Sequence, residues 1–298
     1  MGAPLTPFTT VLTFGVEGKE RRSMSMYFVT VSEMLGTEGA QVAQAAAKGL
    51  NYAYYGEAEL LHFAEDAGFL MDVKKLDERG PHLLERFFSE KPRVYLDRLQ
   101  SVIFEVAKRG NALFFGKGSQ LLLNSFNCAL HVLVTGSLEK RIQRLMEDKN
   151  VDREIAEKMI HRSDQDKRGF LRFAFEEDWL NPNLYDLVLN TDKLAIDSAV
   201  KMVMEAAKSD GIKACGIDSM KLLEKLSLQR KVEAAALEAG MESQHTFFNV
   251  EDGETVRLYG IVYSLNEKEA LEKMMKGIRG VKKVINNLTL FSGAMGGA

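Results

Sequence analysis

Residues 31–43, VSEMLGTEGAQVA, combine a glycine-bearing turn with the start of a helix rich in small residues. Gly36 and Gly39 lie in the turn, which follows an apolar run. Backbone N–H groups at such a turn and helix start suit a phosphate group. However, the stretch contains no lysine or arginine, and it carries Glu33 and Glu38. Two interpretations therefore stay open: an ordinary strand-to-helix turn, or a phosphate loop without its positive charges.

Cationic side chains occur in three later stretches. Phosphoryl transfer asks a protein mainly for positioning and for compensation of negative charge, so these cations are candidates for that chemistry. The alternative is a solvated helix face on which Glu139 and Glu154 pair with them. FFGKGS, LEKRIQRLME and DQDKRGFLR supply the candidate cations Lys117, Arg141, Arg144, Lys167, Arg168 and Arg172.

The composition is that of an ordinary globular protein, with 46% hydrophobic and 27% charged residues. A net charge of -3 gives no global field for nucleic acid or an anionic membrane, so we expect neither as a partner. The N-terminal residues do not have the pattern of a secretory signal. Cys128 and Cys215 show no disulfide framework or metal-ligand spacing, which indicates a cytoplasmic location and no metal site.

Apolar runs alternate with helical patterns along the first two thirds of the chain. This alternation favours an open doubly wound parallel sheet, an α/β fold in which ligands bind at the carboxyl ends of the strands. The predicted strands are 26–31, 111–116, 129–136 and 185–191. The predicted helices are 39–50, 57–70, 94–110, 138–150, 151–175 and 195–209.

The pattern changes after about residue 210. A long helix, an Asp-Gly hairpin, a second helix and a last strand predict a small α+β domain of the order α-β-β-α-β. We therefore expect a four-part organisation. Its parts are an N-terminal extension (1–24), the α/β domain (25–210), the small domain (211–291) and a flexible tail (292–298).

Several motifs resemble known families when they are taken in order. VSEMLGTEGAQVA, ALFFGKGS, LEKRIQRLME and WLNPNLYDLVLNT resemble the cytidylate-kinase-like branch of the P-loop nucleoside monophosphate kinases, over about residues 26–205. VEDGETVRLYGIV and GVKKVINNLTL resemble a BON domain. The first resemblance depends most on the spacing of Trp179, Pro182, Tyr185, Asp186, Asn190 and Thr191.

The first resemblance implies ATP and Mg²⁺ as cofactors. It also implies two sets of site residues and no protein metal ligands. The catalytic set is Arg141, Arg168 and Lys117. The nucleotide-binding set is Gly36, Thr37, Gly39, Gln41, Arg144 and Arg172.

The loop departs from that family at four positions. The flanking arginine positions are Glu33 and Ala40, one turn glycine is Glu38, and the hydroxyl position is Gln41. The BON resemblance implies a non-catalytic module for an unidentified ligand.

Three functions follow from these residues. The first is a degenerate kinase, or pseudoenzyme, that binds a nucleotide or a phosphorylated small molecule and is coupled to the BON-like module. The second is an active ATP-dependent kinase acting on CMP or a related acceptor. The third is a non-catalytic assembly scaffold. Homo-oligomer formation stays open.

Overall fold

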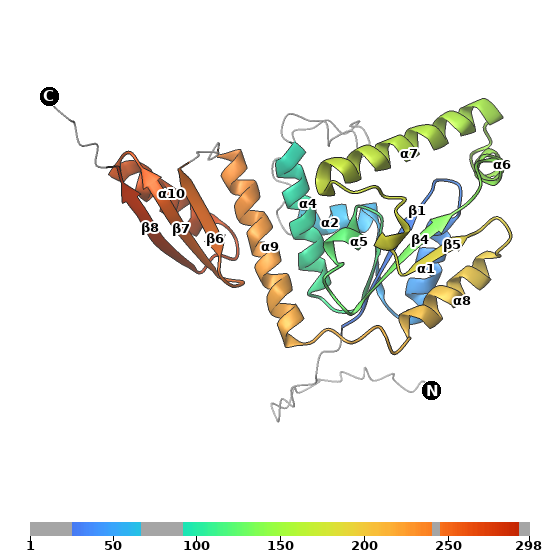
Figure 1. Cartoon of the computed structure of the whole chain (residues 1–298), viewed down its shortest axis with the longest axis horizontal. Helices are drawn as coiled ribbons and strands as arrows, with labels where there is room; N and C mark the ends of the chain where they lie inside the picture. Colours follow the sequence, from blue (N-terminus) through green and yellow to red (C-terminus); the bar gives the residue numbers. More distant parts are fainter. Residues whose placement is uncertain (1–25, 67–91, 240–244, 292–298) are drawn as a thin grey trace, which may run out of the picture.

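The computed structural model describes residues 26–66, 92–239 and 245–291. Figure 1 shows a large α/β part, a long helix beside it, and a small sheet at the other end of the molecule. The predicted N-terminal extension and flexible tail lie outside the described residues, as does the end of the helix predicted over 57–70. Among the described helices, none combines the length and the apolar character needed to cross a membrane.

The large part is built on one parallel sheet of five strands in the order β2-β3-β1-β4-β5. Its strands are β1 (Phe28–Glu33), β2 (Ala53–Tyr55), β3 (Ala112–Phe115), β4 (Ala129–Thr135) and β5 (Leu187–Asn190). The predicted open, doubly wound parallel sheet is therefore confirmed. β2 was not predicted, because it has only three residues and none of them is fully buried.

Helices cover both faces of this sheet. Successive residues of a strand point to opposite faces, so Phe28 packs in one core cluster and Val29 in the other. α1 (Gly39–Leu50) and α8 (Ile196–Ala207) cover the Val29 face. The other face carries α2 (Glu57–Asp66), α4 (Pro92–Ala107) and the short α5 (Ser119–Leu122).

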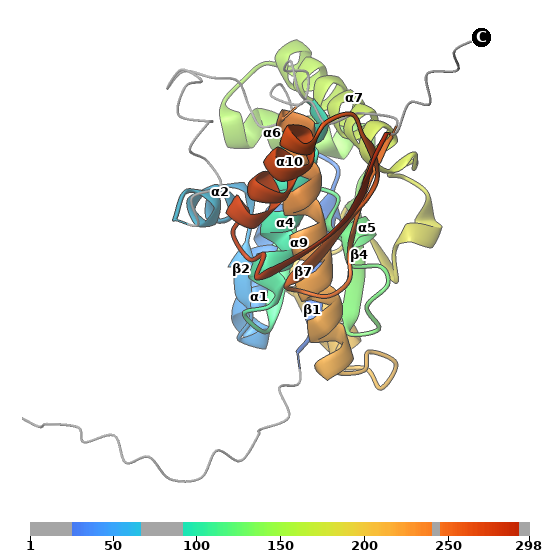
Figure 2. The ribbon, with the colours of Figure 1, turned by 90° about the vertical axis from the view of Figure 1, so that its left-hand side faces the viewer.

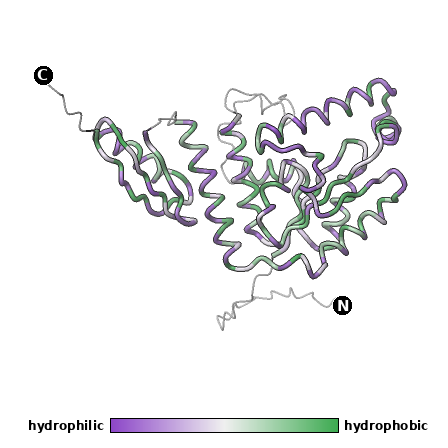
Figure 3. The backbone as a smooth tube through the Cα atoms, in the orientation of Figure 1, coloured by the Kyte–Doolittle hydropathy of each residue, from purple (hydrophilic) through white to green (hydrophobic). Residues whose placement is uncertain are grey.

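A helix pair lies over the carboxyl end of the sheet. α6 (Leu138–Lys149) begins at the cap residue Ser137, whose side chain accepts the N–H of Lys140. α7 (Arg153–Phe175) follows and is capped in the same way by Asp152. Figure 3 shows that α7 is largely hydrophilic, whereas the central strands are hydrophobic. The polar helix α7 thus covers the carboxyl end of the sheet, where ligands bind in folds of this type. A short 3-10 turn, Pro182–Leu184, leads from this region into β5.

The small part has the predicted order α-β-β-α-β. It comprises α9 (Ile217–Glu238), β6 (Thr246–Val250), β7 (Thr255–Val262), α10 (Leu265–Gly277) and β8 (Lys283–Leu290). β6 pairs with β7 in antiparallel fashion, and β8 pairs with β7 in parallel. α9 packs along α4 of the large part, and both ribbon views show the two helices side by side (Figures 1 and 2).

The prediction that the two cysteines form no disulfide, which was based on their spacing, is wrong. Cys128 and Cys215 form a disulfide across 87 residues of sequence. The linker after α8 passes the residues that precede β4 and β1. The N–H of Lys213 donates to the carbonyl of Asn127, and the N–H of Cys215 donates to the carbonyl of Met26. Sequence separation carries no information about this path. The cytoplasmic location stays a prediction.

Candidate functional site

The turn between β1 and α1 forms a tight loop at the carboxyl end of the central strand. The N–H of Thr37 donates to the carbonyl of Met34 at 3.2 Å. Gly36 has a φ of 85° and Glu38 a φ of 61°, so two residues of the loop adopt left-handed backbone. A side chain at Gly36 would lie 2.7 Å from the carbonyl oxygen of Arg141, which explains the glycine there. The loop therefore has the compact shape that the sequence predicts.

The carboxylate of Glu33 folds back onto the start of α1. Its Oε2 accepts the N–H of Ala40 at 3.1 Å. The side chain packs so closely over Gly39 that a Cβ there would lie 2.6 Å from the Cβ of Glu33. Burial raises the pKa of Glu33, while Lys167 and the N–H groups of Ala40 and Gly39 act in the opposite direction. The N–H groups that would meet a phosphate are thus turned toward the protein's own carboxylate.

Lys167 reaches the same loop from α7. Its ammonium donates to the backbone carbonyl of Glu33. The ammonium also lies 5.6 Å from the centroid of the Trp179 ring, within the range of a cation–π contact. Burial lowers the pKa of Lys167, and the negative charges of Glu33 and Asp164 oppose that shift. Lys167 therefore compensates internal acids at the loop.

Arg141 holds the loop and the two covering helices together. The residue is only 2% exposed, and its Nε donates to the carbonyl of Leu35 at 2.7 Å. Its two terminal nitrogens bind Asp164 of α7 at 2.9 and 2.7 Å, a bidentate pair. All of its guanidinium nitrogens thus contact internal acceptors.

Arg144 is held in a comparable way. Its Nε lies 3.2 Å from a carboxylate oxygen of Glu38, and its other nitrogens donate to the hydroxyl and the carbonyl of Thr191. Thr191 in turn donates to the carbonyl of Thr37 in the loop. Glu38, which stands where the resembled family has glycine, therefore binds a predicted nucleotide-binding arginine.

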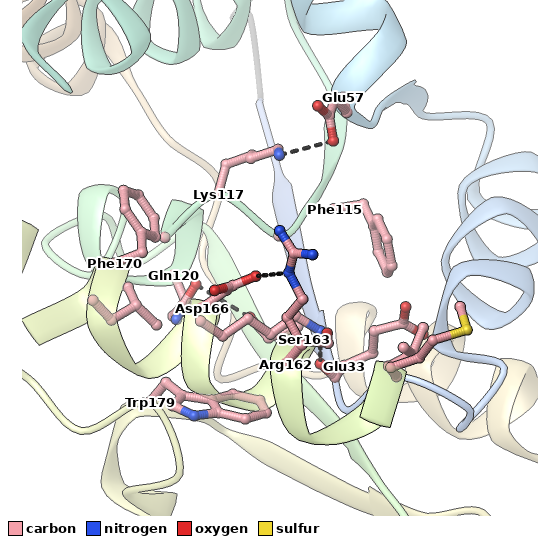
Figure 4. Close-up of a pocket in the computed structure, with 17 residues that line it drawn as sticks. Glu33, Glu57, Phe115, Lys117, Gln120, Arg162, Ser163, Asp166, Phe170 and Trp179 are labelled. Carbon is pink, nitrogen blue, oxygen red and sulfur yellow. Dashed lines mark hydrogen bonds and ion pairs between the residues drawn. The ribbon is translucent and has the colours of Figure 1, made fainter. Parts of the chain in front are cut away.

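A cavity of about 520 Å³ lies beside the loop, between the ends of β1 and β3 and the inner side of α7. Figure 4 shows its charged residues, with Lys117 directed toward Glu57. The ammonium of Lys117 lies 2.9 Å from the carboxylate of Glu57. The turn after β3 bends sharply at Lys117. Three successive residues there have positive φ values: Gly116, Lys117 and Gly118.

Sequence reasoning missed other cavity residues. Arg162 and Asp166 of α7 both line the cavity and lie 3.9 Å apart. Gln120 accepts from Ser32 at 3.2 Å and donates to the Tyr185 hydroxyl at 3.3 Å. The four-residue spacing of Arg162 and Asp166 on a helix was the available signal, because residues at that spacing share one face.

The remaining predicted residues lie apart from the cavity or have internal contacts. Arg168 and Arg172 are exposed on α7, and neither belongs to the described cavity wall. Gln41 is exposed on α1. Thr37 is fully buried, and its hydroxyl donates to the carbonyl of Met34 at 2.7 Å. The structure therefore brings together Lys117, Arg141, Arg144 and the loop, but not Arg168, Arg172 and Gln41.

The described loop does not fit the triphosphate that the resemblance implies. The Glu33 carboxylate takes the N–H of Ala40, and the Thr37 hydroxyl is used inside the turn. A bound triphosphate would have to displace or adjoin a buried carboxylate. In the described part of the chain, no three acidic, histidine or cysteine side chains are grouped to hold a metal ion.

Comparison with protein families identifies two regions. The model described as "Cytidylate kinase-like family" matches residues 28–193, and the model described as "BON domain" matches residues 227–290. The first region contains the loop, the cavity and both covering helices.

Individual relatives agree with the first match. The chain is 25% identical over 183 residues to a protein of Methanocaldococcus jannaschii named cytidylate kinase, covering 60% of this chain and 96% of the relative. It is 28% identical over 104 residues to a protein of Staphylothermus marinus with the same name, covering 34% and 57%. An uncharacterized protein from Eubacterium ventriosum has a similar fold, with a TM-score of 0.50, 18% identity, and coverage of 61% of this chain and 99% of the other.

Proposed function

Because the chain belongs to the cytidylate kinase-like family and carries a BON domain, we propose that it is a ligand-binding regulatory protein with weak or absent phosphotransfer. Its kinase-type domain binds a nucleotide or a related small molecule in the cavity beside the loop. The BON domain binds a second ligand and is coupled to the first domain through α9.

One observation carries this proposal: the Glu33 carboxylate occupies the anion position at the start of α1, where it accepts the N–H of Ala40. A phosphate oxygen about 4 Å from that carboxylate would be repelled by roughly 4 kcal/mol at an effective dielectric constant near 20. This corresponds to about a thousandfold in affinity. ATP binding at the loop is therefore strongly disfavoured.

The contacts of the covering helices support the same conclusion. In phosphoryl transfer, arginines compensate the charge that develops on the transferred group. Here the guanidinium of Arg141 binds Asp164, and that of Arg144 binds Glu38 and Thr191. Redirecting either arginine to a phosphate would leave an internal carboxylate without its partner.

Coupling between the two domains is supported by the contacts of α9 with α4. Glu105 of α4 accepts from Ser227 at 2.6 Å and from Lys231 at 2.5 Å. Burial acts to raise the pKa of Glu105, but Lys108 and then Lys231 and Ser227 lower it to about 2. A partly buried network thus joins α9, the first helix of the small part, to α4.

The test is calorimetry of the full chain with ATP, ADP and CMP in the presence of Mg²⁺, together with an assay for ADP formation. We expect no measurable ATP affinity at millimolar concentration and no turnover. Micromolar ATP affinity with CMP-dependent ADP formation would overturn the proposal in favour of an active kinase. Failure of every small ligand to bind would leave only a scaffold role.

A further inference from the structure

The charges of the cavity cancel one another. Its described wall contains three acidic and three basic side chains. Lys117 pairs with Glu57 at 2.9 Å, and Arg162 lies 3.9 Å from Asp166. Lys167 donates to the backbone of Glu33 and lies beside its carboxylate. The dashed contacts in Figure 4 show the first two pairs facing each other within the site.

A phosphate dianion is poorly matched to such a wall. Sites that bind phosphate present cations whose donors point to the ligand. In this cavity, a phosphate that approached Lys117 would also come close to the carboxylate of Glu57, which lies 2.9 Å from the ammonium. The two negative charges would then repel each other at short range. An uncharged ligand meets no such repulsion.

The rest of the wall consists of apolar and neutral polar side chains. Phe115 supplies a half-buried aromatic ring and Ser163 a half-buried hydroxyl group, whereas Phe170, Trp179, Gln120 and Ser32 line the cavity but are buried. The indole N–H of Trp179 is buried and has no hydrogen-bond acceptor among the described residues. A volume of about 520 Å³ lies within the usual range of roughly 300–1,000 Å³ for small-molecule sites.

We propose that this cavity binds an uncharged nucleoside in preference to the corresponding monophosphate. The planar base would lie against the half-buried ring of Phe115, and the sugar hydroxyls would meet Ser163. This inference depends on the proposed function, because it specifies the ligand of the same site. The two are tested by different measurements. This inference depends on the affinity for a nucleoside relative to its monophosphate, whereas the proposed function depends on whether ATP binds.

The chain contains a single tryptophan, and this residue lies in the cavity wall. Tryptophan fluorescence excited near the red edge of its absorption therefore reports on this cavity, and calorimetry supplies the affinity. The probes are cytidine, uridine, adenosine and guanosine, each compared with its 5′-monophosphate, and inorganic phosphate. We expect at least one nucleoside to change the fluorescence and to bind at least as tightly as its monophosphate. Inorganic phosphate should not bind.

Glu57→Gln gives a directional test. It removes the acid that holds Lys117, so we expect the preference to move toward the monophosphate by about tenfold or more. Glu65→Gln, an exposed change on the same helix, should leave the preference as it is. A monophosphate that binds tenfold more tightly than its nucleoside in the native chain would overturn the inference. So would the absence of binding by all four nucleosides, or an unchanged preference in Glu57→Gln. None of these results bears on ATP binding at the loop. The proposed function is tested by ATP affinity and turnover, so the two can fail independently.

Discussion

The carboxylate of Glu33 accepts a hydrogen bond from the backbone N–H of Ala40, 3.1 Å away, across the loop that joins β1 to α1. A residue at the end of the strand thus fills the position that the helix start offers to an anion. The loop has glycines at positions 36 and 39 and a compact shape, and an internal carboxylate accepts the N–H group of Ala40 at its helix start.

Neutralising Glu33 should restore part of the anion affinity. Glu33→Gln removes the charge and keeps the size, so ATP binding, which we expect to be undetectable at millimolar concentration in the native chain, should become measurable. Glu33→Ser also removes the bulk and should give a larger gain, up to the thousandfold suggested by the charge estimate. Calorimetry with ATP and Mg²⁺ measures both, with Glu65→Gln as the control. Unchanged affinity in both variants would mean that the loop does not face the ligand.

Arg141 should matter for stability more than the exposed arginines of α7 do. Arg141→Ala breaks a bidentate pair and leaves Asp164 without its partner, so the free energy of unfolding should fall by about 3 kcal/mol. Arg168→Ala, an exposed change, should alter it by less than about 0.5 kcal/mol. Urea denaturation followed by circular dichroism compares the two. Equal effects would contradict the structural role assigned to Arg141.

Reduction of the disulfide should destabilise the chain. The bond between Cys128 and Cys215 spans 87 residues, for which the chain-entropy model gives about 4.6 kcal/mol. We expect Cys128→Ser/Cys215→Ser and the reduced native chain to unfold at similarly lowered urea concentrations. If added reductant leaves the midpoint of the oxidised native chain where it was, the bond makes no contribution of this size.

Asp97 should make stability depend on pH at the contact of α4 with α9. Burial, and then the nearby charge of Glu233, raise the pKa of Asp97 from 3.8 to about 6, although Arg230 opposes the shift. The folded chain therefore holds this proton more tightly than the unfolded chain, and stability is lost as pH rises from about 4 to 6. Asp97→Asn should stabilise the chain by about 1–3 kcal/mol at pH 8.

The same variant should give little or no gain near pH 3, where Asp97 is largely protonated in both the folded and the unfolded chain. Thermal unfolding across this pH range, with Asp210→Asn as an exposed control, checks the sign. A gain of equal size at both pH values would show that the charge of Asp97 is not its cause.

Periodicity was sufficient for most of the fold. Long apolar runs and amphipathic stretches predicted four of the five parallel strands and the order of the small domain, since each pattern repeats over many residues. β2 escaped because a strand of three half-exposed residues has no periodicity to detect. The disulfide was not predicted because it depends on the path of the linker after α8, which brings Cys215 close to Cys128. No local sequence pattern encodes that path.

The sequence predicts a site at the carboxyl end of the sheet, where the described cavity lies, but it does not predict how the charged side chains pair there. The glycine turn and Lys117 both lie at this edge. That Glu33 turns inward, and that Glu38 and Asp164 bind the predicted arginines, depends on side-chain directions set by the packing of α6 and α7 over the loop. Residue types and spacing are equally compatible with arginines that pair with internal acids and with arginines that face a bound phosphate.

α9 contributes to two hydrophobic cores. Leu223 packs with the large sheet, whereas Leu228, little more than a turn further on, and Val232, one turn beyond that, pack with β6–β8. The family match for the BON domain begins at residue 227, inside this helix. A gene fragment that begins at residue 227 would keep Leu228 and Val232 with β6–β8, but it would cut α9 in two and leave residues 217–226 of the helix with the large part. An exchange of BON modules between proteins, in evolution or in the laboratory, would need its crossover before Ile217, where the whole helix travels with one partner.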